Sequence, residues 1–127
     1  MERIESPRTD DVSIESEIVA KGLTAPRVTP ADIEANIAAA YYFTAAEAAG
    51  MPPVEGVDYI PERVRVPLDL LTLCVLVLRN GFTVTGESAC ASPENFDAEL
   101  GRKIARANAV NKMWPLMGYA LKERLSV

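Results

Sequence analysis

Apolar residues are most regularly arranged in this chain between residues 71 and 90. From 71 to 78 nearly every side chain is apolar, whereas the run that begins at Phe82 starts by alternating apolar and polar side chains. Asn80 and Gly81 separate the two runs, and both tolerate the positive φ that a two-residue type I′ turn requires. The pattern therefore predicts a central β-hairpin with a type I′ turn at Asn80-Gly81.

This turn also predicts the register of the hairpin and the composition of its two faces. Val77 is expected opposite Val84, and Leu71 opposite Cys90, which makes a disulfide between Cys90 and Cys74 within the hairpin improbable. One predicted face carries Leu73, Val75, Val77, Phe82 and Val84, and the other carries Cys74, Leu76, Leu78, Thr83, Thr85 and Glu87. The first strand is thus apolar on both faces, as strands covered on both sides are.

The face with Cys74, Leu76 and Leu78 needs a cover. We expect that either the N-terminal helices or a second copy of the chain provides it. A sheet of two strands also leaves edges open to pairing, and proteins usually cover or pair such edges. Both points lead us to expect a homo-oligomer.

Helix signals precede the hairpin. Residues 1–12 are polar and without a period, so we expect a disordered tail, followed by a short helix that begins at Ser13 and ends near Gly22. Thr29 and Pro30 predict the start of a second helix. The apolar stripe of that helix is expected to be Ile33, Ile37 and Tyr41. Further along, Thr44 and Glu47 have the spacing of a capping box, which predicts a new turn there.

A long helix is predicted to follow the hairpin. Ser92 is the expected N-cap and Pro93 the first helical residue. Pro115 lacks a backbone donor and costs about 3 kcal/mol in a straight helix, so we expect a kink between Asn111 and Pro115. Apolar residues recur at spacings of three and four, and the predicted core stripe is Phe96, Leu100, Ile104, Ala107, Val110, Trp114, Met117, Leu121 and Leu125.

These elements make a single α+β domain over residues 13–127, a size that suits one hydrophobic core. The segment from Gly50 to Pro67 holds four prolines and two glycines, and we expect it to be a mobile loop. No apolar run is long enough to span a membrane, and the first residues lack the pattern of a signal peptide. We therefore expect a soluble, cytosolic protein.

Charge and composition narrow the classes of ligand. The chain has a net charge of −5, with net −7 over residues 1–69 and net +2 over residues 70–127. Duplex DNA binding needs a dense basic face, so this balance argues against it, whereas a small anion held by two or three basic groups is compatible with it. The chain contains no histidine, and its two cysteines cannot complete a zinc site, so we expect no metal and no cofactor.

Signatures of catalysis are missing from the sequence. The segment Gly86–Cys90 resembles a nucleophile elbow, but it lacks the final glycine, and no histidine exists to act as the base. Glycine patterns for phosphate or dinucleotide binding are also absent, and the carboxylates near Glu94 have the placement of helix-start charges. We expect a protein that is not an enzyme and has no catalytic residues.

Three groups of residues are candidates for ligand binding. Thr24 and Arg27 precede a predicted helix start, where an arginine fork and free backbone donors suit phosphate. An aromatic side chain from the run at residues 41–43 could stack on a base, and Arg102 and Arg106 lie one helical turn apart. Each group also has a plain explanation: a surface ion pair, core or interface packing, and a solvated helix face, respectively. The candidate residues are Thr24, Arg27, Tyr41, Tyr42, Arg102 and Arg106.

Two long runs of sequence resemble a known family. "NGFTVTGESACASPENFD", followed by "WPLMGY", and the earlier "KGLTAPRVTPADIEANI" are similar to small tailed-phage proteins. The family is named for the gene-forty-nine product of an N-four-type phage and the gene-sixty-six product of an Sf-six-type phage, and the resemblance covers about residues 13–127. It implies a phage or prophage accessory protein in the host cytoplasm, and it brings no catalytic residues with it.

Two functions are compatible with this resemblance. The first is a sponge that sequesters a nucleotide signal of host defence, held at a subunit interface by Arg27, a tyrosine of the aromatic run, and Arg102 or Arg106. The second is an inhibitor or regulator that binds a host or phage protein through the acidic N-terminal half or the proline-rich loop. The arginines and aromatics favour the sponge, whereas the acidic balance favours a protein partner.

Overall fold

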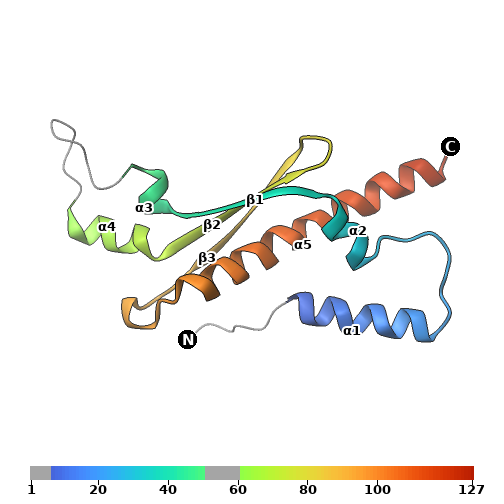
Figure 1. Ribbon diagram of the computed structural model, residues 1–127, viewed down its shortest axis with the longest axis horizontal. Helices are drawn as coiled ribbons and strands as arrows, with labels where there is room; N and C mark the ends of the chain where they lie inside the picture. The colour runs from blue at the N-terminus through green and yellow to red at the C-terminus, as the bar shows by residue number, and fades with distance from the viewer. Residues whose placement is uncertain (1–6, 51–60) are drawn as a thin grey trace.

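The computed structural model describes residues 7–50 and 61–127, in which an antiparallel sheet and a long helix form two layers (Figure 1). The sheet has the strand order β1 (Ile37–Thr44), β2 (Leu71–Leu78) and β3 (Thr83–Ala89). The described helices are α1 (Pro7–Ala20), α2 (Pro30–Ala35), α3 (Ala45–Ala48), α4 (Glu62–Asp69), the 3₁₀ turn η1 (Pro93–Asn95) and α5 (Ala98–Leu125). This arrangement confirms the predicted α+β class.

The hairpin between β2 and β3 is confirmed, but the predicted type I′ turn at Asn80-Gly81 is wrong. Gly81 has a φ of 90°, whereas no residue type other than glycine has a positive φ in the described ranges. The Leu78 N–H donates to the Phe82 carbonyl at 2.8 Å, which closes a three-residue loop with glycine last. The Asn80 side chain accepts from the Phe82 N–H at 2.9 Å, a local bond that suits Asn80 in this wider loop.

The longer loop shifts the register by one residue and changes which side chains share a face. Val84 lies opposite Leu76, not opposite Val77 as predicted, and Ala89 takes the place expected for Cys90 opposite Leu71. Helix α5 lies across one face of the sheet, and its contacts fall mainly on β3 and β2. The face beneath α5 carries Thr72, Cys74, Leu76, Leu78, Val84, Gly86 and Ser88.

The cover expected from the N-terminal helices or a second copy is therefore provided by α5. Leu76 is fully buried and Leu78 nearly so within a single chain. A second copy of the chain is therefore not needed to cover this face. The opposite face of β2, with Leu73, Val75 and Val77, is only half-buried.

The third strand was not predicted. Residues 37–44 were expected to continue a helix, but α2 ends at Ala35, and β1 pairs with β2 so that Tyr42 lies opposite Cys74. Ile33 is buried as predicted, because it lies on α2 and packs into the core although the helix ends two residues later. Pairing with β2 outweighs the helical preference of the alanines in β1.

Helix α5 approaches the sheet through small residues. Gly101, Ala105, Ala109 and Met113 are buried at a spacing of four residues, which places them on one helix face. The predicted apolar stripe is correct at Ala107 and Val110 but not at Leu100 or Leu125, which are exposed. Small side chains mark the first half of the packing face, up to Ala109, because the backbones of α5 and β3 are very close at Gly86, and the large Met113 follows beyond this contact.

The start of α5 also differs from the prediction. The N-cap is Asp97, whose carboxylate accepts from the Leu100 N–H at 3.0 Å, whereas Ser92 precedes the 3₁₀ turn and makes no side-chain cap bond. The helix continues through Pro115 to Leu125.

Replacing this cap tests the observed start of the helix. Asp97→Ala should lower the free energy of unfolding by about 1 kcal/mol, because the first turn loses its side-chain acceptor. Ser92→Ala, which removes no cap bond, should cost much less. Urea denaturation followed by circular dichroism measures both, and equal costs would contradict the assignment.

The remaining predictions concern the N-terminal half and the proline-rich segment. The predicted capping box at Thr44 is present, and Thr29 caps α2 as predicted, in a capping box with Asp32 that was not predicted. Helix α1 starts at Pro7, six residues before the predicted start at Ser13. Helix α4 occupies the end of the segment expected to be a loop, and residues 51–60 of that segment lie outside the described residues.

Candidate functional site

Three arginines from distant parts of the sequence line one cavity of about 520 Å³. Arg27 comes from the segment before α2, Arg79 from the β2–β3 loop, and Arg124 from the last turn of α5. Asn36 and Asn80 are also in the lining, and Asp32 is the one acidic residue that the described ranges contribute to it. We call this cavity the arginine pocket.

Two of the arginines are held by hydrogen bonds to different elements. Arg27 donates through Nη1 and Nη2 to the two carboxylate oxygens of Glu15 on α1, with an Nη2–Oε2 distance of 2.8 Å. This bond holds the pKa of Glu15 below its usual value, so the carboxylate stays charged. Arg79 donates through Nε to the Ala35 carbonyl at 2.6 Å, which ties the hairpin loop to the end of α2.

The charge around the arginine pocket is opposite in sign to that of the whole chain. The lining itself, with three arginines and one aspartate, has a net charge of +2, and the Glu15 carboxylate paired with Arg27 lowers the local charge to +1, whereas the chain carries −5. Guanidinium groups present planar sets of donors that match carboxylate and phosphate oxygens. The pocket therefore has the chemistry of an anion site.

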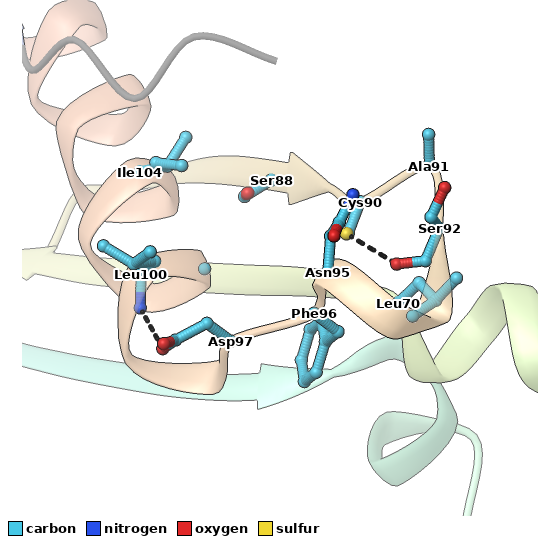
Figure 2. Close-up of a pocket in the computed structure, with 11 residues that line it drawn as sticks. Leu70, Ser88, Cys90, Ala91, Ser92, Asn95, Phe96, Asp97, Leu100 and Ile104 are labelled. Atoms are coloured by element: carbon cyan, nitrogen blue, oxygen red, sulfur yellow. Dashed lines mark hydrogen bonds between the residues drawn. The ribbon is translucent and has the colours of Figure 1, made fainter. Parts of the chain in front are cut away.

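A second cavity of about 300 Å³ lies at the opposite end of α5, where β3 leads into the helix (Figure 2). Phe96 and Asn95 lie beside it, Ser88 is buried at its wall, and the Cys90 thiol donates to the Ser92 carbonyl at 3.2 Å. Within the described part of the chain, no basic side chain lines this cavity. Its chemistry suits an uncharged polar or planar group rather than a phosphate.

Two of the predicted site residues contact each other away from both cavities. Arg106 donates to the Tyr42 hydroxyl at 3.2 Å and to Glu34 at 2.9 Å. Cys74 lies in the core beside them, where burial raises the pKa of its thiol. These bonds join α2, β1 and α5, so this cluster contributes to the packing of the three elements.

The six predicted residues do not form one site. Arg27 lines the arginine pocket. It also forms the ion pair with an acidic residue of the N-terminal half that was the alternative expectation for it. Tyr41 is 61% exposed on the face opposite α5, and Thr24 and Arg102 are exposed and line neither cavity. Arg79 and Arg124 were missed, because the pairing of β1 with β2 brings the hairpin loop beside α2, and the packing of α5 on the sheet brings its last turn there.

Comparison with known proteins identifies the family of the chain. Residues 28–125 match the phage protein family described as N4 Gp49/phage Sf6 gene 66. The chain belongs to this family. No curated protein and no solved structure matches this phage protein. None of the helices within residues 7–50 and 61–127 has the length and apolar character needed to cross a bilayer.

Proposed function

We propose that this phage protein is a non-enzymatic binding protein that captures a nucleotide-derived signal in the host cytoplasm and so counters host defence. The observation that carries the proposal is the convergence of Arg27, Arg79 and Arg124 on one cavity. Phosphate groups are the part of a nucleotide that such a set of donors recognises. The family match supports the phage setting, and the pocket supports the anionic ligand.

The size and chemistry of the arginine pocket agree with capture rather than turnover. Its volume falls within the range of about 300–1,000 Å³ that small-molecule sites occupy. Asn36 and Asn80 add amide groups that can bond to sugar or base, whereas the described residues place no serine, cysteine or lysine in the lining to act as a nucleophile. The Asp32 carboxylate of the lining already accepts from the Thr29 N–H at 3.0 Å, and with this group engaged we expect a bound nucleotide to be held without being changed.

A thermal-shift screen tests the proposal. Wild-type protein should be stabilised by about 4 °C or more by a saturating ligand among cyclic dinucleotides, cyclic trinucleotides and ADP-ribose derivatives. Arg124→Ala and Arg27→Ala should remove that stabilisation. Arg63→Ala, an exposed residue of α4 outside the pocket, makes the same change of charge and should leave it intact.

The screen also has a contradicting outcome. If no nucleotide stabilises the wild-type protein, or if Arg63→Ala weakens binding as much as Arg124→Ala does, the pocket is not the site. The first result would favour the second candidate function, binding of a protein. The open face of the sheet supports that alternative, because Tyr41, Phe43 and Leu73 form an apolar surface there, and such surfaces often contact proteins.

A further inference from the structure

Two carboxylates between residues 11 and 20 make polar contacts from helix α1 to the rest of the chain. None of the residues 11–20 is buried, and three of its large apolar side chains are more than half exposed. Asp11 accepts a hydrogen bond from the Trp114 indole N–H at 3.2 Å, and Glu15 pairs with Arg27. Figure 1 shows α1 alongside α5 and away from the sheet. These two carboxylate contacts help to hold the described part of the helix in place.

The pair between Glu15 and Arg27 uses the donors that a phosphate in the arginine pocket needs. Both terminal nitrogens of Arg27 donate to Glu15, and each side chain of the pair is only about one-quarter exposed, at 27% and 26%. Arg27 at the same time lines the pocket. One guanidinium fork cannot grip a carboxylate and a phosphate in the same two-pronged way. A ligand that takes the Nη1–Nη2 edge of Arg27 therefore competes with Glu15 for it.

We infer that Glu15 is an internal competitor that makes the arginine pocket selective for ligands with more than one negative charge, and that such a ligand releases Glu15 from Arg27. The inference rests on the proposed function. A singly charged ligand at Arg27 only replaces one anion with another of equal charge. A polyanion such as a diphosphate can also use Arg79 and Arg124, which line the same cavity, and these contacts offset the loss of Glu15.

Release of Glu15 has a built-in optical readout. Trp114 is the single tryptophan of the chain, and its indole bonds to α1 through Asp11. A ligand that displaces Glu15 removes one of these two polar contacts of α1, which loosens the helix over Trp114. The emission of Trp114, which is half-buried while α1 is docked, should then move to longer wavelength.

Titration with inorganic pyrophosphate and with acetate tests the inference. Glu15→Gln should bind pyrophosphate about fivefold or more tightly than wild type, because the competitor loses its charge but keeps its shape. Glu17→Gln is the matched control, since Glu17 on the same helix is exposed and pairs only with Lys21 at 3.1 Å among the described residues. Calorimetry gives the affinities, and Trp114 emission follows α1. Acetate should leave the wild-type emission unchanged.

The outcomes separate this inference from the proposed function. If wild type binds pyrophosphate in a way that needs Arg124, but Glu15→Gln and Glu17→Gln bind equally tightly and the emission is constant, the pocket stands and the role of Glu15 is overturned. If acetate shifts the emission as pyrophosphate does, the charge selectivity is overturned. If neither wild type nor Glu15→Gln binds pyrophosphate, both the pocket and the inference fail.

Discussion

Gly86→Ala is expected to destabilise the protein by about 3 kcal/mol or more, a large part of the about 5–15 kcal/mol that keeps a domain folded. A Cβ atom on Gly86 would lie 2.2 Å from the Ala105 carbonyl oxygen and 2.3 Å from the Ala109 backbone nitrogen. Both neighbours are backbone atoms of α5, so no side chain can turn away. The helix would have to lift from β3, and the buried contacts of Ala105 and Ala109 would be lost with it.

The same substitution at another glycine provides the control. Gly118 lies within α5, and a Cβ atom added to it would meet no atom of the described residues within 4 Å. Gly118→Ala should therefore stabilise the helix by about 0.5–1 kcal/mol. Urea denaturation followed by circular dichroism compares the two variants with wild type. Equal midpoints for Gly86→Ala and wild type would show that α5 does not approach β3 as closely as described.

Local signals in the sequence predicted local structure well. The predicted capping box at Thr44 depends on residues three positions apart and is present, and Thr29 caps α2 as predicted. The two strands of the hairpin were also placed correctly, because the sequence of apolar and polar residues that indicates each strand lies within the strand itself. The turn was the exception: an Asn-Gly pair fits a two-residue and a three-residue loop, and the choice moves every pairing by one residue.

Features that depend on distant parts of the chain could not be read in this way. The run of residues 37–44 has alanines that suit a helix, and only the presence of β2 as a partner makes it a strand. The candidate site could be predicted only in part for the same reason. Arg27 was found from its place before a helix start, but Arg79 and Arg124 join it only because the sheet and α5 bring the three together.

Leu76→Ala should cost about 2–5 kcal/mol of unfolding free energy, since Leu76 is fully buried beneath α5 and its loss leaves a cavity. Leu73→Ala is a matched change on the same strand, at a half-buried position of the opposite face, and should cost less than about 1.5 kcal/mol in a single chain. Denaturation at several protein concentrations adds a second test. If copies associate through the open face, the midpoint of wild type will rise with concentration, and Leu73→Ala will weaken that rise while Leu76→Ala will not. A cost for Leu73→Ala as large as that for Leu76→Ala at every concentration would instead contradict the assignment of Leu73 to the half-buried face.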